Sequence, residues 1–339
     1  MEKFGKVIVK LRIPILILSF LLLIPSAIGY FNTRVNYDIL YYLPNEIETM
    51  QGQDILMDDF NKGAYAMVVV QNMDTKSTDR LIKKVENVDH VAQVISYTGI
   101  GGEDVPSEIV PSKFRKYFEN DSTDTTLFAI FFDNTTSSDD TMNAIIQIRE
   151  QTEGQAFISG MSAVVTATKN FSEKETPLYV LIAVVLVCIV LAIFMDSFLV
   201  PVFFMISIGM AIVYNLGSNI LLGEVSYITK ALAAVLQLGV TLDYSIFLWH
   251  SYKEMKEIYP DDHKEAMAVA ISNTLTSVVG SSITTVAGFI ALCFMSFTLG
   301  LDLGIVMAKG VVFGVICCVT VLPSMVLIFD KAYLHLTGH

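Results

Sequence analysis

The sequence predicts an α-helical membrane protein with six transmembrane helices and one extracytoplasmic α+β domain of ferredoxin-like fold. Two observations carry this prediction. The 339 residues are 53% hydrophobic and only 17% charged, with a mean hydropathy of +0.57, whereas soluble domains are richer in charge. The apolar residues gather in six long runs, and a polar segment with β-rich and helix-like stretches separates the first run from the second.

Each apolar run is long enough to cross a hydrocarbon core of about 30 Å as a helix. The runs occupy 13–31, 177–195, 199–222, 226–249, 271–294 and 301–329. The first run resembles a signal peptide because basic residues precede it. Its apolar part is longer than that of a typical signal peptide and no convincing cleavage site follows, so we expect an uncleaved helix.

Basic residues predict the orientation of these helices. Lys3, Lys6, Lys10 and Arg12 precede the first helix, which places the N-terminus in the cytoplasm. Alternation then puts residues 32–176 outside, residues 250–270 inside with a solvated amphipathic connector at 253–267, and the C-terminus in the cytoplasm. The predicted layout is an N-terminus and first helix, an outer domain, a bundle of helices two to six, and a tail or linker, with bounds 1–31, 32–176, 177–330 and 331–339.

The outer segment shows a split βαβ pattern, which is typical of ferredoxin-like domains. Strands are expected at 64–71, 91–97, 125–133 and 156–160, with helices at 77–88 and 137–153. Ser77 is the expected N-cap of the first helix. A glycine-rich turn at 99–104 and a short helix at 111–119 complete the domain. Residues 161–176 form a connecting helix, and Pro177 suits the first turn of the second membrane helix.

Charge and cysteine usage exclude several classes of function. The net charge of −12 arises almost entirely in 32–176, which argues against nucleic acid and against docking to anionic lipid. No CxxC or Cys/His spacing predicts a metal site, and no nucleophile–base arrangement predicts an enzyme. All four cysteines lie in membrane segments, so none stabilises the outer domain: Cys188, Cys293, Cys317 and Cys318.

The most informative stretch is LQLGVTLDYSIFLWHSYKE (236–254), because it places Asp243 inside the fourth membrane helix. An ionised Asp at a helix centre costs about 2.5–3.5 kcal/mol, so such residues face a bundle interior or water and usually have a function. A carboxyl group in a water-poor site holds its proton more tightly than in water, and can therefore load and release it. The phenol of Tyr244 can donate to a neighbouring carboxylate.

Two other interpretations of Asp243 stay open. It could be a structural tie, bonded to a Ser or Thr of another helix. Alternatively, the helix ends early and Asp243 lies at the membrane surface, where Trp249 beside His250 would form an interface belt. The fifth helix favours an interior position, since TLTSVVGSSITTVAGF (274–289) is rich in small and hydroxylated residues. Supporting contacts are expected from Gly239, Ser281, Ser282 and Thr285.

Another intramembrane charge, Lys309, has no assigned role. It could reach toward the outer side or pair with an acid, but Asp302 lies about two turns away, too far for an easy pair.

The membrane residues resemble a known family. One helix, an outer ferredoxin-like domain and five more helices is similar to the repeat unit of resistance-nodulation-division (RND) transporters. LGVTLDYSIFLWHSYKE resembles the helix-four signature of their MMPL branch, and VVGSSITTVAGFIALCF resembles helix five of that branch. LGLDLGIVMAKGVVFGVICCVTVLPSMVLIFD is similar to helix six. The resemblance is strong over 236–330 and loose in the outer domain.

This resemblance implies a proton-driven exporter of lipids or other hydrophobic molecules in a bacterial cell membrane. Asp243 and Tyr244 match the proton-relay positions, with protons as the coupling ion and no cofactor. Family members usually contain two repeats, whereas this chain contains one. The resemblance therefore implies a second repeat as partner, supplied by a C-terminal half, by a homodimer or by another half-sized chain.

Two alternative functions share this architecture. One is a SecF-like accessory subunit of protein translocation, which matches the half size and the six helices, although helix four of that family resembles Asp-Thr-Val rather than Asp-Tyr-Ser. The other is a lipid- or sterol-sensing module that does not pump. The sequence leaves the identity of the substrate open.

Overall fold

A computed structural model describes residues 2–60, 63–96, 112–120, 123–152, 154–195 and 199–337. The chain divides into a membrane unit, residues 1–36 and 174–339, and an outer unit, residues 37–173. The turn expected at 99–104 lies outside the described residues.

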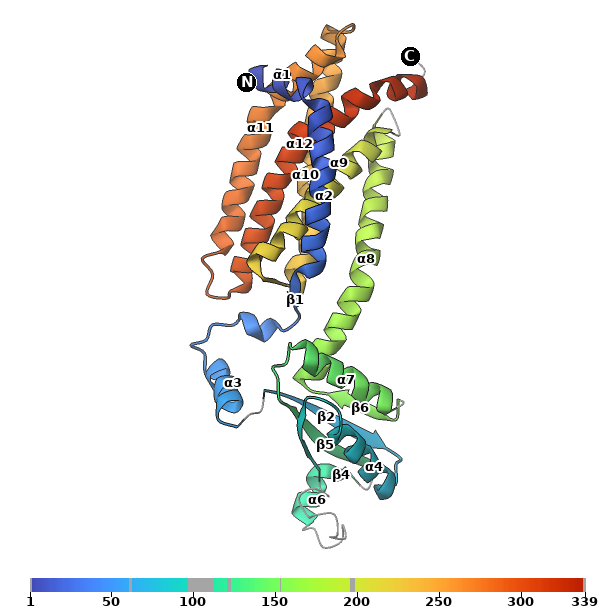
Figure 1. Cartoon of the computed structure of the whole chain (residues 1–339), viewed down its shortest axis with the longest axis vertical. Helices are drawn as coiled ribbons and strands as arrows, with labels where there is room; N and C mark the ends of the chain where they lie inside the picture. Colours follow the sequence, from blue (N-terminus) through green and yellow to red (C-terminus); the bar gives the residue numbers. More distant parts are fainter. Residues whose placement is uncertain are drawn as a thin grey trace. The chain divides into compact units, whose positions relative to one another are not determined.

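The membrane unit confirms the six predicted transmembrane helices. Five of them run side by side, and α8 stands beside this group (Figure 1). The helices are α2 (Arg12–Asn32), α8 (Met161–Phe194), α9 (Leu199–Gly217), α10 (Tyr227–Ile258), α11 (His263–Leu292) and α12 (Leu299–Thr337), with a 3₁₀ turn η2 (Ser218–Leu222) after α9.

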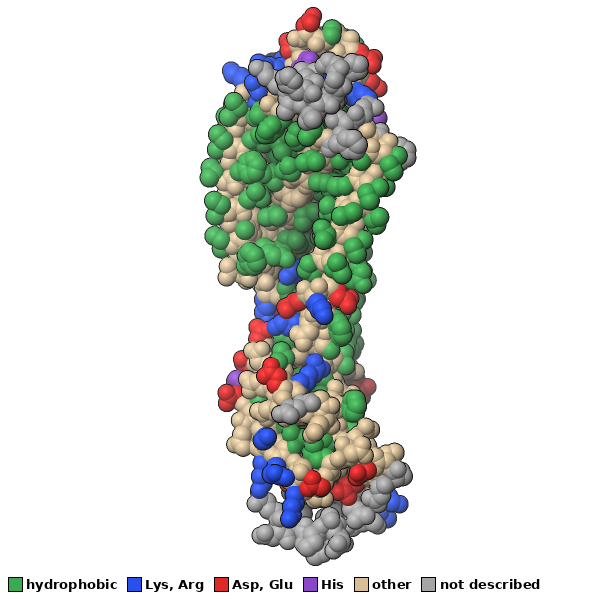
Figure 2. Space-filling model, turned by 90° about the vertical axis from the view of Figure 1, so that its right-hand side faces the viewer, with side chains coloured by type: hydrophobic (Ala, Val, Ile, Leu, Met, Phe, Trp, Pro, Cys, Tyr) green, Lys and Arg blue, Asp and Glu red, His purple; other side chains and the backbone are tan. Residues whose placement is uncertain are grey.

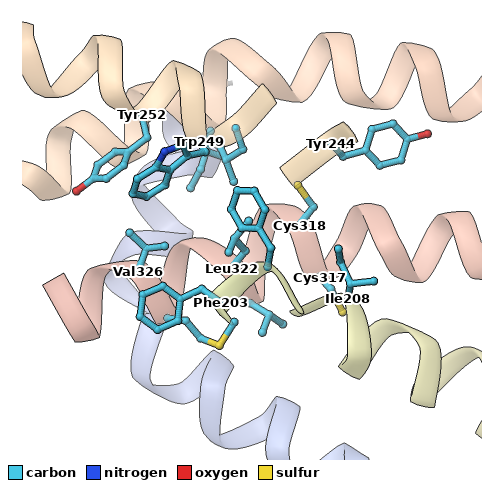
Figure 3. Packing of buried hydrophobic residues seen from close by; sticks show 14 of the residues in the cluster. Phe203, Ile208, Tyr244, Trp249, Tyr252, Cys317, Cys318, Leu322 and Val326 are labelled. Carbon is cyan, nitrogen blue, oxygen red and sulfur yellow. The ribbon is translucent and has the colours of Figure 1, made fainter. Parts of the chain in front are cut away.

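The core of the bundle lies around α9 and α12. In each, 61% of the most apolar window is buried, against 11% in α11 and 6% in α8. Large side chains of α9, α10 and α12 interdigitate there, among them Phe203, Trp249, Tyr252 and Leu322 (Figure 3). Burial of apolar surface against other helices therefore distinguishes the central helices from the peripheral ones. Figure 2 shows apolar side chains covering the flank of the bundle.

Glycine allows α2 and α9 to touch at the backbone. A Cβ on Gly29 would overlap the carbonyl oxygen of Gly217, and a Cβ on Gly217 would overlap that of Ser26. Small residues at helix contacts permit this close approach in membranes. These two positions fix the distance between the helices.

The predicted connector between the fourth and fifth membrane helices is largely helical, and the turn within it is short. α10 continues to Ile258 and α11 begins at His263. Pro260 disfavours helical backbone at the preceding residue, and Tyr259 has φ −121° and ψ 65°. Asp262 then caps α11, accepting hydrogen bonds from the amides of residues 264 and 265, each at 3.1 Å.

Two elements of the membrane unit were not predicted. A helix α1 (Glu2–Lys10) precedes α2, and a two-stranded parallel sheet joins β1 (Arg34–Asn36) to β7 (Glu224–Ser226). This sheet connects the end of α2 to the start of α10. The two strands, of three residues each, are too short for a clear periodic pattern in the sequence.

The outer unit has the ferredoxin-like fold. Its main strands are β2 (Ala64–Gln71), β3 (Val91–Ile95), β5 (Thr125–Phe132) and β6 (Ala156–Ser159), antiparallel in the order β3-β5-β2-β6. Helices α4 (Thr75–Glu86) and α7 (Asp139–Gln151) supply residues to the core formed with the sheet. Smaller elements are η1 (Ile39–Tyr42), α3 (Glu48–Asp58), α6 (Ser112–Phe118) and β4 (Glu119–Asn120).

Two local predictions are wrong. Asp74, not Ser77, is the N-cap of α4: its carboxylate accepts from the Ser77 amide at 3.2 Å and from the Ser77 hydroxyl at 2.6 Å. Pro177 does not begin a helix, because α8 is continuous from Met161 to Phe194. A proline removes only one backbone hydrogen bond, and the apolar run beyond it continues the helix.

We predict that Gly217→Ala destabilises the bundle by about 1–3 kcal/mol, because the new methyl group overlaps the backbone of α2. Gly209→Ala is the matched control in the same helix. A Cβ there meets nothing within 4 Å, and alanine favours helix, so stability should hold or rise. Thermal unfolding of the detergent-solubilised chain measures both. Equal melting temperatures for the two variants would contradict the contact.

We also predict that the α4 cap is sensitive to pH. Hydrogen bonds from the hydroxyl and then the amide of Ser77 lower the pKa of Asp74 below its ordinary value of 3.8. The cap therefore stabilises α4 above that value and loses its effect as the pH falls through the lowered pKa. Hydrogen exchange of α4 amides in the full chain should speed up in Asp74→Ala at neutral pH. Asp74→Asn should protect α4 without this pH dependence.

Candidate functional site

Asp243 lies on an outward-facing stripe of α10, inside the membrane span. Its side chain is exposed on the isolated chain, and within the described part of the structure its carboxylate has neither a hydrogen bond nor an ion pair. α10 continues for about four more turns, to Ile258, so Asp243 does not sit at an early helix end. Among the described residues, Asp243 also does not form the alternative structural bond to a Ser or Thr of another helix. The open stripe of α10 comprises Leu232, Leu236, Gly239, Asp243 and Phe247.

Tyr244 points in a different direction from Asp243. Its side chain is 3% exposed and belongs to the apolar core that also contains Cys318 of α12, although its ring points away from Cys318 (Figure 3). Successive residues of a helix are about 100° apart, which separates the two side chains. Trp249 is also buried in this core, so it does not form the exposed belt of the alternative interpretation.

The four predicted supporting residues take different positions. Gly239 is exposed, and a Cβ there would meet nothing within 4 Å. On α11, Ser281 is exposed and Thr285 is half-buried, with its hydroxyl donating to the Ser281 carbonyl at 3.1 Å. Ser282 is buried and donates to the carbonyl of Val279 at 2.9 Å. Within the described residues, none of these groups is bonded to Asp243.

α11 presents an unusual surface for a helix at the edge of a membrane bundle. Its exposed residues recur every three or four positions and many are small or polar, although α11 has little buried surface. A Cβ on Gly280 or Gly288 would meet nothing within 4 Å. The small-residue face of α11 comprises Asn273, Ser277, Gly280, Ser281, Thr284, Ala287, Gly288 and Ala291.

The exposed side chains of α8 are of the opposite kind. They are large and aliphatic, which suits contact with acyl chains. Those with the largest exposure along the helix include Leu178, Leu181, Val185, Leu186, Ile189 and Ile193.

A second polar group lies inside the bundle, on the other side of α10. The Asn215 amide donates to the Gln237 side-chain oxygen at 3.0 Å, and Gln237 donates to the carbonyl of Gly310 at 3.0 Å. A Cβ on Gly310 would crowd the Asn215 amide nitrogen at 2.6 Å, so glycine is required there. The amides thereby join α9, α10 and α12. These amides were not predicted from the sequence, although an amide in a membrane helix is a signal comparable to the carboxylate of Asp243.

Lys309 is held within the bundle. Its ammonium donates to the side-chain oxygen of Asn219 in η2 at 2.6 Å. Asp302 takes separate partners at the start of α10: it accepts from the amide of Ser226 at 2.8 Å and from the hydroxyl of Thr229 at 2.6 Å. Both charged groups therefore tie α12 to neighbouring segments. Lys309 and its partner Asn219 are 90 residues apart, and Asp302 and Thr229 are 73 residues apart. Contacts between such distant residues cannot be predicted from a local sequence pattern.

The described residues contain no group of three or more His, Cys, Asp or Glu side chains placed to hold a metal ion. The chemistry available at the open stripe of α10 is that of one carboxyl group, which can bind and release a proton.

Six membrane helices, a ferredoxin-like domain after the first and an intramembrane carboxylate define a multi-pass membrane protein with one α+β domain outside the bundle. Solved structures agree with this fold. Two structures of SecDF, an RND-superfamily protein, match 95% and 96% of this chain and 38% of their own, with TM-scores of 0.52 and 0.50 at 14% identity; one is from Thermus thermophilus and the other is in a super-membrane-facing form.

The family model of MMPL proteins matches residues 42–335, so this chain belongs to the MMPL family. Among curated relatives, the membrane protein MJ1562 of Methanocaldococcus jannaschii is 25% identical over 237 residues, which are 68% of this chain and 60% of that protein. The membrane protein ActII-3 of Streptomyces coelicolor is 32% identical over 171 residues, 49% of this chain and 24% of that protein. The matched part is thus less than two thirds of either relative.

We predict that Gln237→Leu destabilises the bundle by about 1–3 kcal/mol, because the buried amide of Asn215 loses its acceptor. The double variant Asn215→Leu/Gln237→Leu removes both partners and should recover part of this loss. A double-mutant cycle of thermal unfolding in detergent measures the coupling. Strictly additive effects would show that the two amides do not interact.

Proposed function

We propose that this chain is one repeat of a proton-driven membrane transporter, with Asp243 as the proton carrier. A single observation supports this most: Asp243 is the carboxylate on the membrane part of α10 that has no partner in the described part of the chain. An ionised side chain facing acyl chains is costly, so its position favours a site that a further protein surface completes. Protons moving down their gradient would drive the transport of the cargo, and the proposal includes no enzymatic step.

The partner that completes the site is a second RND repeat. The small-residue face of α11 favours this proposal, because Gly, Ser, Thr and Ala let another helix approach closely and offer hydroxyls for bonding. Lipid alone would favour the large aliphatic residues that α8 exposes. The second repeat comes from further residues of a longer protein, from a second copy or from another half-sized chain. The length of MJ1562 favours the existence of half-sized chains. The 237 aligned residues make up 60% of that protein and 68% of this chain, so the two chains are of similar length.

The proposed cargo is a lipid or another hydrophobic or amphiphilic molecule. The exposed aliphatic side of α8, with 6% of its apolar window buried, offers a surface against which an acyl chain can lie. The expected location is the bacterial cell membrane, with the N- and C-termini in the cytoplasm and residues 32–176 outside. The basic N-terminal residues lie at the same end of the bundle as the last turns of α10, with Lys253 and Lys256, and the start of α11, with Lys264, which favours this orientation (Figure 1).

Protonation would change the charge state of the contact between repeats. A charged Asp243 requires water or polar partners, whereas a neutral one tolerates close apolar packing. Each proton that crosses the membrane supplies about 2.3 kcal/mol per 100 mV. Alternating between these two packings would couple proton entry to passage of the cargo.

A SecF-like role in protein translocation is the second candidate. The SecDF structures favour it at the level of fold, and one of them is described as a translocon-associated membrane protein. Co-purification with the translocon of the host would support this role. A sensing module that does not pump is distinguished from both by the absence of proton flux.

We predict that Asp243→Asn abolishes proton-linked export. Cells expressing the chain with its complete assembly are loaded with Nile Red, energised with glucose, and followed by fluorescence. Efflux should stop in the variant and in cells treated with an uncoupler. Glu254→Gln is the matched control, because Glu254 is an exposed carboxylate about three turns further along α10 on the same face. Efflux that persists undiminished in Asp243→Asn at equal expression would refute the assigned role.

We predict that Gly280→Leu prevents assembly without unfolding the chain. The new side chain enters open space in the isolated chain but would collide with a helix packed on the small-residue face of α11. Two copies carrying different tags should co-purify as wild type and should not do so when both carry this change. Leu186→Phe on the aliphatic side of α8 is the control. Equal co-purification of both variants would place the partner elsewhere.

A further inference from the structure

The N-terminal helix α1 is a fixed element that presents three different faces. One face packs against α11: Gly5, Ile8 and Val9 are buried, and Gly5 touches the carbonyl oxygen of Ala268 so closely that no Cβ fits. Lys6 adds an ion pair to Glu265, with Nζ and Oε1 2.8 Å apart. α1 is therefore docked across the end of the bundle rather than trailing from it (Figure 1).

The other two faces of α1 are exposed and differ in chemistry. Phe4, Val7 and Leu11 follow one another at helical spacing and form an exposed apolar stripe. Lys3, Lys6 and Lys10 form a basic face beside it. A basic face next to an apolar stripe is typical of helices that lie in the headgroup layer of a membrane, with the stripe toward the acyl chains.

An open groove of about 380 Å³ lies between α1 and the start of α11. Its two carboxylates are already engaged, since Glu265 pairs with Lys6 and Asp262 caps α11. Three further cations line the groove, and within the described residues none of them has a carboxylate at ion-pairing distance. They are Lys10, Arg12 and Lys264.

Acidic and basic residues are unevenly distributed along this chain, so its net negative charge does not describe the membrane unit. Residues 37–173 hold 22 of the 34 acidic side chains and 10 of the 22 basic ones, and therefore account for the whole net charge of −12. The first twelve residues hold four basic side chains and one acidic one. The membrane unit thus carries no net charge to repel an anion from its basic end.

We propose that this groove binds the phosphate headgroup of an anionic phospholipid. Basic pockets beside membrane helices bind such headgroups, and the three available cations supply the complementary charge. The apolar stripe of α1 favours a lipid over a free anion, because it places acyl chains next to the groove. The bound lipid would hold α1 against α11 at the end of the bundle that also carries the α10–α11 turn. This site is independent of the transport proposed above.

The test is lipid binding to the detergent-solubilised full chain, measured by native mass spectrometry. The probes are short-chain phosphatidylglycerol, phosphatidylcholine with the same chains, and inorganic phosphate. Wild type should bind phosphatidylglycerol at least about tenfold more tightly than phosphatidylcholine, and rising salt should weaken this preference. The double variant Lys10→Gln/Arg12→Gln should lose the preference. Lys76→Gln/Lys84→Gln, which removes the same charge from α4 of the outer unit, should retain it.

Each result decides the proposal. Equal binding of the two lipids by wild type, or a preference unchanged by salt or by the double variant, would overturn it. Inorganic phosphate that competes as well as phosphatidylglycerol would overturn the assignment to lipid, because a free-anion site needs no apolar stripe. If the double variant fails to fold, the wild-type comparison of lipids across salt concentrations still supports or overturns it.

Discussion

The hydrocarbon of a membrane offers no water to polar groups, and this constraint organises the whole bundle. α10 carries polar side chains on two sides. On the side that faces the bundle core, Gln237 is hydrogen-bonded to Asn215 and to the carbonyl of Gly310. On the side that faces away from the bundle, Asp243 has no hydrogen-bond or ion-pair partner among the described residues. The same helix thus has bonded polar groups toward the inside of the bundle and an unbonded one on its open face, which is why the proposed function places a further protein surface there.

The kind of residue that a helix exposes says more than the amount of exposed surface. α8 and α11 bury similarly little of their apolar windows, 6% and 11%. α8 exposes long aliphatic side chains, whereas α11 exposes Gly280, Ser281, Thr284 and Gly288. Packing between helices in lipid depends on close approach and on bonds between polar groups, because burial of apolar surface gains little there. α8 is therefore suited to lipid, and α11 is suited to another helix.

The sequence predicted the features that depend on composition and local periodicity. Six apolar runs identified the six spans, and alternation of strand and helix identified the ferredoxin-like order, with β2 at 64–71 as expected. It could not predict the features that depend on distant partners. The bond between Lys309 and Asn219, the contact of Gly29 with Gly217, and the pairing of β1 with β7 join segments far apart in the chain.

The errors at element ends have a related cause. Ser77 and Asp74 both suit an N-cap, and the side chain that accepts the amide hydrogen bond decides between them. Pro177 suits a first turn by residue type alone, yet the helix continues through it. Asp243 was located on a membrane helix from the sequence, but the direction of Tyr244 required the packing of α12.

The separation of Asp243 from Tyr244 suggests how a change at the open stripe would reach the rest of the repeat. The two side chains belong to the same turn of a continuous helix, one exposed and one packed in the core that also contains residues of α12. Close-packed cores transmit strain because their side chains have little free volume in which to move. If Asp243 carries the proton as proposed, a shift of α10 that follows loss or gain of this proton would therefore displace Tyr244 within the core that α10 shares with α12. α12 is also held by Gln237 and by the Lys309 bond to η2, so the displacement would extend through the bundle rather than stay at the stripe.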